Sequence, residues 1–148
     1  MDPKSLWTIT TNSAQATGET APSGPAAAAI DGNLATYWHS QYSPAAIALP
    51  YNLTVDMFIA TNITALKFAL RSALSRPVKR IRLETSLDGS SWTEVGGSPF
   101  TVPQVEGLQT FTLTNPVTAR YFRVIIPSTA DTDGTGNTSI AELDIVRQ

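Results

Sequence analysis

Residues 78–95 read VKRIRLETSLDGSSWTEV, a pattern typical of two antiparallel strands joined by a tight turn. In the first half, Ile81 and Leu83 alternate with charged residues, which is the period-two pattern of a half-buried strand. The pair Asp88-Gly89 suits a turn whose backbone needs positive φ, and residues 91–95 resume the strand pattern. The stretch therefore predicts a β-hairpin with one face against a core.

Similar short runs of alternating or apolar residues occur along the rest of the chain. They cover residues 7–11, 53–57, 64–70, 109–113, 119–126 and 140–146. The run at 119–126 is apolar on both faces and predicts a central strand. A Gly-, Pro- and Ala-rich stretch at 18–29 predicts an irregular loop, with one helical turn near residues 26–30. Because ten prolines in the connections also disfavour long helices, we predict an all-β sandwich of about eight antiparallel strands.

Composition excludes several classes of function. The chain has 148 residues, one histidine and no cysteine. Without cysteine there is no disulfide, thiolate zinc site or cysteine nucleophile, and one histidine cannot build a three-histidine metal site. With 10 basic and 12 acidic residues, the chain has no excess positive charge for nucleic acid or an anionic membrane. The 20 threonines and 13 serines favour strands and loops over amphipathic helices.

We expect residues 1–148 to form a single domain taken from a longer secreted or surface protein. The length suits one domain with a core of its own. The first residues are polar and no apolar run of signal-peptide length follows, so any signal sequence would lie upstream. The longest uncharged run, residues 32–55, contains one histidine, one glutamine, two asparagines and two prolines, which a bilayer does not accept.

Two groups of residues could form a binding site for a hard cation. Asp31-Gly32-Asn33 forms a tight turn, and the hydroxyl of Thr36 follows closely, so carboxylate, hydroxyl and carbonyl oxygens gather as calcium requires. Such a turn is also common at surfaces without any ligand. Glu142 alternates with Leu143 on the last predicted strand, where a solvated charge is the simpler interpretation.

A second group consists of His39 and Tyr42. A lone histidine is commonly a structural residue, and a tyrosine in a polar loop is commonly part of the core. Both side chains nevertheless have the chemistry of a sugar site, because an aromatic ring covers the C–H face of a pyranose at little entropic cost. The residues alone leave both interpretations open.

Four motifs in order along the chain resemble those of the discoidin domain, also called the coagulation factor V/VIII C-type domain. They are DGNLATYWHS (31–40), SLDGSSW (86–92), ARYFRV (119–124) and IAELDI (140–145). Within that family the chain is similar to the family 32 carbohydrate-binding modules. The resemblance extends over residues 5–146 and implies a galactose-binding-like jelly roll.

The resemblance implies a structural Ca2+ ion that joins the first loop to the last strand. Its ligands would be the carboxylates of Asp31 and Glu142, the hydroxyl and carbonyl of Thr36, and the carbonyls of Ala28, Asn33 and Ala141.

The resemblance also implies a sugar site. His39 would hydrogen-bond a sugar hydroxyl, Tyr42 would stack on the ring, and Arg71 would donate its forked N–H groups, with Arg76 in reserve. Ser75 stands near the position of a family asparagine, and Asn137 would supply a polar contact. The loop at 129–138 lacks the second aromatic residue that family members carry there.

We therefore expect a non-catalytic carbohydrate-binding module that recognises a terminal, galactose-type sugar weakly. No nucleophile elbow or phosphate loop is present to support an enzyme. The alternative is an adhesion or structural spacer module of the same fold, with a protein ligand or no glycan ligand, and binding to a glycan panel separates the two. The expected partners are a glycan or glycoconjugate and neighbouring domains, without nucleic acid or membrane insertion. A monomer outside the cell or at the cell surface, of bacterial origin, is expected.

Overall fold

The computed structural model describes residues 3–148, so residues 1 and 2 of the predicted domain lie outside the described residues. The strands are β1 (Thr8–Thr11), β2 (Trp38–His39), β3 (Tyr51–Leu70), β4 (Arg80–Ser86), β5 (Thr93–Glu94), β6 (Phe100–Thr101), β7 (Leu108–Ile126) and β8 (Ser139–Arg147). Four short 3-10 helices accompany them, namely η1 (Pro3–Leu6), η2 (Ala26–Ala29), η3 (Ser72–Leu74) and η4 (Thr129–Asp131). Within the described part of the chain, no helix is long and apolar enough to cross a membrane.

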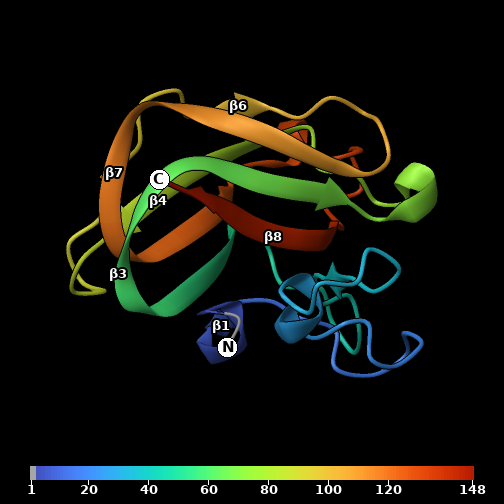
Figure 1. Cartoon of the computed structure of the whole chain (residues 1–148). Coiled ribbons are helices and arrows are strands. Elements are labelled where there is room, and N and C mark those ends of the chain that lie inside the picture. The colour runs from blue at the N-terminus through green and yellow to red at the C-terminus, as the bar shows by residue number, and fades with distance from the viewer. Residues whose placement is uncertain (1–2) are drawn as a thin grey trace.

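The eight strands form an antiparallel sheet that folds over itself into two layers (Figure 1). The strand order is β2-β8-β3-β7-β4-β5, with β1 paired to β3 and β6 paired to β4. β3 and β7 are bent, and each contributes one half to each layer. The first half of β3 pairs with β1 and the second half with β8, while β7 follows β3 along both halves. The predicted antiparallel sandwich of about eight strands is confirmed.

Two pairs of predicted strands are in fact single long strands. Residues 53–57 and 64–70 both belong to β3, and residues 109–113 and 119–126 both belong to β7. The alternation breaks at the bends, where the register shifts between Asp56 and Thr61 and Phe58 adopts a positive φ of 73°. β2 and β6 were not predicted, because a two-residue strand is too short to show a period.

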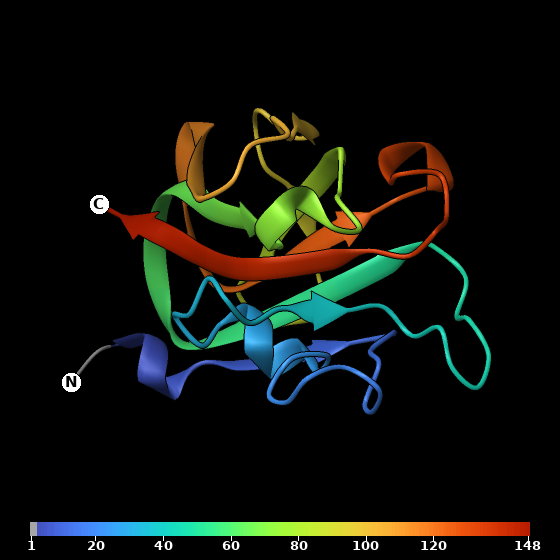
Figure 2. The same ribbon diagram turned by 90° about the vertical axis from the view of Figure 1, so that its right-hand side faces the viewer.

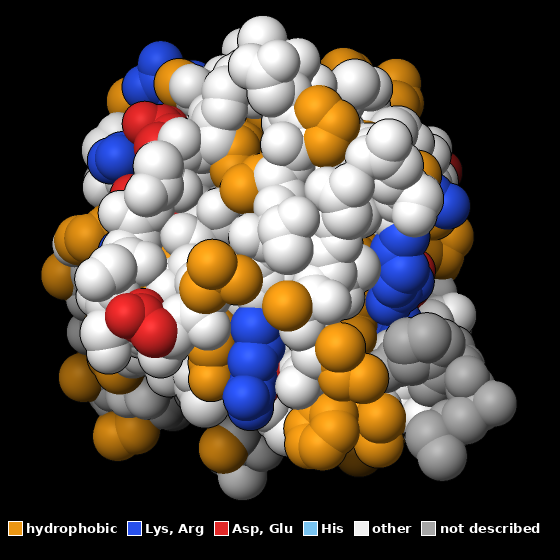
Figure 3. All heavy atoms as spheres, turned by 60° about the vertical axis from the view of Figure 1, so that its left-hand side comes forward, with side chains coloured by type: hydrophobic (Ala, Val, Ile, Leu, Met, Phe, Trp, Pro, Cys, Tyr) orange, Lys and Arg blue, Asp and Glu red, His pale blue; other side chains and the backbone are white. Residues whose placement is uncertain are grey.

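The core lies between the two layers. Its large, fully buried side chains include Trp38, Phe68 and Phe122. Trp92 does not belong to this core, because it is only partly buried and lies on the outer face, where the Arg123 guanidinium stacks 4.2 Å from its ring. Exposed hydrophobic side chains form separate groups among polar ones on the face shown in Figure 3.

Strand register brings four loops to one end of the sandwich, the end that faces the viewer in Figure 2. β8 lies between β2 and β3, so that Ile140 is opposite Trp38 on one side and Leu70 on the other. His39, which follows Trp38, and Arg71, which follows Leu70, therefore lie at the same end as the loop before β8. The irregular loop at 12–37 packs beside His39. The His39 N–H donates to the Gly24 carbonyl of this loop at 3.0 Å.

Candidate functional site

All five residues predicted to bind sugar line one cavity of about 360 Å³ at this end of the molecule. They are His39, Tyr42, Arg71, Ser75 and Asn137, and the lining is completed by Glu19 and Arg76. His39 ends β2, and the other six residues come from four separate loops that strand pairing holds together. The structure therefore brings these residues together around one cavity, and their contact with sugar stays a prediction.

His39 is held as a neutral hydrogen-bond acceptor. Its Nδ1 lies 2.7 Å from the Ser40 carbonyl, which can only accept, so Nδ1 carries the proton and Nε2 presents a lone pair. Burial lowers the pKa of His39 below its ordinary value, and this effect outweighs the hydrogen bond to Ser40, which raises it. The neutral form is therefore favoured around pH 7, and Nε2 is suited to accept a hydrogen bond from a hydroxyl group.

Glu19 is the acceptor that organises three other side chains, two that line the cavity and one beside it. Its carboxylate accepts hydrogen bonds from the hydroxyls of Tyr37, at 2.6 Å, and of Tyr42. Its Oε1 also lies 4.0 Å from Nη1 of Arg71, whose guanidinium stacks 3.8 Å from the centre of the Tyr37 ring. Burial raises the pKa of Glu19, but the hydrogen bonds from the two tyrosines outweigh it and lower the pKa below the ordinary value. Glu19 is therefore ionised at neutral pH and fixes the position of the ring and the guanidinium.

The backbone beside Tyr42 is positioned by Gln15, which is buried. The Gln15 side-chain carbonyl accepts the N–H of Tyr42 at 2.9 Å and that of Ser43 at 3.1 Å. Gly24 makes this arrangement possible, since a Cβ atom there would lie 2.3 Å from the Gln15 backbone carbonyl oxygen and the φ is +111°. A loop that looks irregular in sequence is thus fixed by close contacts.

The loop after β3 carries an unusual backbone. Ala73, Leu74 and Arg76 all adopt positive φ, which costs free energy in residues other than glycine and is frequent in functional loops. Arg76 lies 3.6 Å from the Asp133 carboxylate in the loop before β8. This ion pair links the two loops beside the cavity.

Sequence reasoning missed Glu19, and it missed the supporting roles of Gln15 and Tyr37. One signal was available, because Glu19 is the only charged residue between Lys4 and Asp31. A single charge in such a stretch is a reason to look for a specific partner.

The residues predicted to hold a cation also come together. The Thr36 hydroxyl lies 2.5 Å from Oδ2 of Asp31 and 3.1 Å from the Asn33 carbonyl oxygen. η2, which contains Ala28, packs against β8, which contains the buried Ala141. A carboxylate, a hydroxyl and a carbonyl oxygen thus lie close together in the loop before β2.

Glu142 is not a solvated charge, because it is only 4% exposed. Burial raises its pKa above the ordinary value; Lys4 opposes this shift, while the nearby Asp31 adds to it. The Lys4 ammonium lies 3.2 Å from Oε2, whereas Oε1 is buried without a hydrogen-bond partner among the described residues. The described residues contain no group of three or more His, Cys, Asp and Glu side chains, so a cation here would rely on two carboxylates with carbonyl and hydroxyl oxygens.

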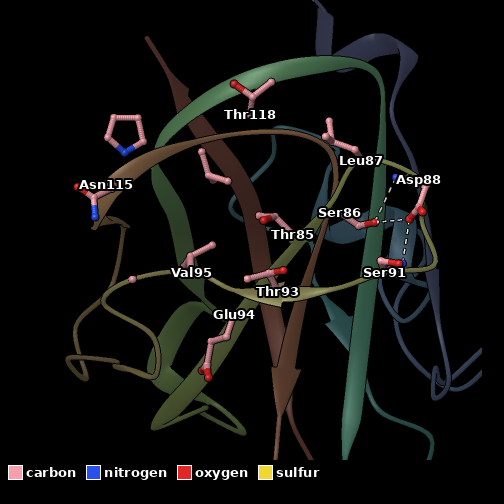
Figure 4. Close-up of a pocket in the computed structure, with 13 residues that line it drawn as sticks. Thr85, Ser86, Leu87, Asp88, Ser91, Thr93, Glu94, Val95, Asn115 and Thr118 are labelled. Carbon is pink, nitrogen blue, oxygen red and sulfur yellow. Dashed lines mark hydrogen bonds between the residues drawn. The ribbon is translucent and has the colours of Figure 1, made fainter.

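A larger cavity, of about 500 Å³, is lined by none of the predicted residues. It lies between β4, β5 and the bend of β7, where small hydroxyl and aliphatic side chains surround it (Figure 4). Asp88 is engaged locally, as its Oδ1 accepts from the Ser86 hydroxyl at 3.0 Å and from the Ser91 N–H at 2.9 Å. With no aromatic, Lys or Arg side chain in its lining, this cavity lacks the ring and the forked donor found around His39.

Comparison with known protein families finds one match. The F5/8 type C domain profile matches residues 8–143. A curated relative, the sialidase of Micromonospora viridifaciens, is 29% identical over 128 residues, which is 84% of this chain. The chain spans 19% of the length of that relative.

Solved structures show the same fold. The C-terminal domain of a chitobiase from Bacteroides fragilis is 31% identical, with a TM-score of 0.84 over 99% of this chain and 96% of that one. A CBM32 structure from Clostridium perfringens, in complex with GalNAc-β-1,3-galactose, has a TM-score of 0.83 at 24% identity and covers 97% of this chain and 96% of that one.

Proposed function

The chain belongs to the F5/8 type C domain family, and we propose that it is a non-catalytic carbohydrate-binding module that holds a terminal galactose-type sugar in the cavity around His39. One observation carries the proposal, namely the convergence of His39, Tyr42, Arg71 and Asn137 on one cavity. The C. perfringens CBM32 structure, which has this fold and is in complex with GalNAc-β-1,3-galactose, supports the choice of a galactose-type ligand.

The chemistry of the cavity suits a neutral sugar. The neutral His39 accepts from one hydroxyl, Arg71 donates to two oxygens through its fork, and the Tyr42 ring covers a C–H face. Glu19 balances the charge of Arg71. A shallow site with these few contacts is expected to bind near millimolar concentration, about −4 kcal/mol.

Titration with a glycan panel that includes galactose and N-acetylgalactosamine tests this function. Wild-type protein is expected to bind at least one sugar, and Tyr42→Ala is expected to weaken that binding at least about tenfold, because the stacking ring is lost. NMR chemical-shift titration measures both affinities.

Gln41→Ala is the matched control, since Gln41 lies in the same loop, does not line the cavity, and makes its side-chain hydrogen bond to the Ala45 carbonyl at 3.0 Å. It is expected to bind like the wild type. Unchanged binding by Tyr42→Ala would contradict the site, and no binding to any glycan would favour an adhesion or spacer module.

We also propose that the module forms part of a longer chain outside the cell. The sialidase relative supports this arrangement, because the chain matches only a fifth of its length. Weak binding becomes effective when the module is tethered to a second domain, which raises the local concentration of sugar near its partner.

We further propose a structural Ca2+ ion at Asp31, Thr36 and Glu142, with the carbonyls of Ala28, Asn33 and Ala141. The residues fit such an ion, because the buried Oε1 of Glu142 has no partner among the described residues. The ion would join the first loop to β8, two segments far apart in the chain. Its role would be to hold them together.

Addition of calcium is expected to raise the melting temperature. At a free concentration about 100 times the Kd, the stabilisation is about 2.7 kcal/mol, or roughly 5–10 °C for a domain of this size. Differential scanning calorimetry in CaCl2 and in chelator measures the shift. Glu142→Gln should abolish it and the surface control Asp133→Asn should keep it. Equal melting temperatures in calcium and chelator would rule out the ion.

A further inference from the structure

A second cavity adjoins the proposed sugar site. It has a volume of about 300 Å³ and is lined by residues 46–49, Tyr51, Thr129 and residues 135–137. Asn137 lines both cavities. Each cavity also takes lining residues from the connection between β2 and β3 and from the loop before β8. The two cavities therefore meet at Asn137 and share these two loops.

Asn137 carries hydrogen-bonding groups suited to this boundary. Its backbone N–H donates to the Thr135 hydroxyl at 3.2 Å, while its side-chain amide makes no hydrogen bond to another described residue. An amide has two donor positions and one acceptor oxygen. The side chain of Asn137 can thus contact hydroxyl groups in both cavities at once.

The second cavity differs from the first in charge. No Lys, Arg, Asp or Glu lines it, whereas Glu19, Arg71 and Arg76 line the first. One of its walls is aliphatic, with Ala46, Ile47 and Ala48 in sequence.

Two polar groups of this lining are already engaged within the protein. The Tyr51 hydroxyl donates to the Ile47 carbonyl at 2.7 Å, and the Thr135 hydroxyl donates to Asp133 at 2.5 Å. Such a cavity favours an uncharged ring with an apolar face over a sulfated or uronic one, because a charged group would be desolvated there without a partner.

We propose that the second cavity binds the next unit of a neutral oligosaccharide, so that the module recognises a disaccharide end and not a single sugar. This inference rests on the proposed function, since the terminal unit must occupy the cavity around His39. The glycosidic bond would cross the boundary beside Asn137. Both cavities have volumes at the lower end of the range, about 300–1,000 Å³, that is usual for small-ligand sites, as expected for one unit each.

The test compares one terminal sugar with and without a second unit. The probes are methyl β-galactoside and galactose joined β-1,3 or β-1,4 to N-acetylglucosamine. At least one disaccharide is expected to bind the wild type about fivefold to tenfold more tightly than the methyl glycoside, since it adds a hydrogen bond and apolar contact. Isothermal calorimetry or NMR titration measures the ratio.

Ala48→Arg is designed to fill the second cavity from its aliphatic wall, where Ala48 is exposed. It should remove the preference for the disaccharide. Ala45→Arg adds the same side chain to an exposed position of the same loop that lines neither cavity, and it should keep the preference.

The outcomes distinguish a failure of this inference from a failure of the proposed function on which it rests. Equal affinity for the methyl glycoside and both disaccharides would overturn the second subsite and leave the terminal-sugar site standing. A preference that survives Ala48→Arg would place the second unit elsewhere and also overturn the inference. Failure of every saccharide to bind would overturn the proposed function and the inference together.

Discussion

Replacing Trp38 with alanine is expected to lower the free energy of unfolding by about 3–5 kcal/mol. Trp38 is fully buried, its ring packs edge-on against Tyr51 at 6.2 Å, and its Nε1 donates to the Ser13 carbonyl at 2.7 Å. The substitution opens a large cavity and removes one of the two donors to that carbonyl, which keeps only the Thr11 hydroxyl at 3.1 Å. Such a loss is a large share of the 5–15 kcal/mol that is usual for a folded domain.

Urea denaturation measures this loss through the transition midpoint and slope. Trp92→Ala is the matched control, because Trp92 is only partly buried and packs on the outer face beside Tyr121. Trp92→Ala should lower the free energy of unfolding by clearly less than Trp38→Ala does. Trp38→Phe keeps most of the ring volume and gives a folded variant of intermediate stability if Trp38→Ala does not fold. Equal costs for the two alanine variants would contradict the central place of Trp38 in the core.

Replacing Glu19 with alanine is expected to weaken sugar binding about 10- to 100-fold, the largest effect of any single change at the site. Without the carboxylate, the Tyr37 and Tyr42 hydroxyls lose their acceptor and Arg71 loses its anionic neighbour. The ring and the guanidinium are then no longer held in place. In the variant, sugar binding must order the Tyr42 ring and the Arg71 guanidinium. This ordering makes the binding free energy less favourable than in the wild type, where both groups are already held in place.

NMR titration of the sugar found in the panel measures this effect, and the melting temperature of each variant shows that the fold is retained. Glu19→Gln keeps one acceptor oxygen but no charge and should be intermediate. Glu94→Ala removes an acid from β5, which lines neither loop cavity, and should bind like the wild type. If Glu19→Ala binds as tightly as the wild type, Glu19 does not position the site.

Most strands could be predicted from the sequence, because the alternation that marks them is local. Ile81 and Leu83 face the core as predicted, and the apolar run at 119–126 forms part of β7, which is central. The bends within β3 and β7 were not predicted, since a register shift changes the direction of a strand without ending its pairing. Trp92 lies beside a predicted strand but packs beneath Arg123 on the outer face, so a tryptophan in a strand region does not by itself mark the core.

The residues of the candidate site also fall into those that the sequence predicted and those that only the structure revealed. His39, Tyr42, Arg71, Ser75 and Asn137 were chosen by their order relative to family motifs, and the structure places them around one cavity. Glu19 and Lys4 do not belong to any of the family motifs. Their roles depend on the side chains that lie beside them only in the folded chain. Glu142 shows the difference most clearly, since its alternation with Leu143 predicts a solvated strand position and the loop at 26–36 buries it.

By itself the sequence determined that the chain is an antiparallel β-sandwich and which family motifs it carries. Both properties depend on residues that are close together in the chain. They can therefore be inferred from the periodicity of apolar residues and from the order of the motifs. Only the tertiary structure decided that Glu19 organises the cavity around His39, that Lys4 pairs with Glu142, and that a second cavity meets the first at Asn137. Each of these contacts joins segments that are remote in sequence. Their proximity is set by how β8 aligns between β2 and β3, and a single stretch of sequence does not contain that register.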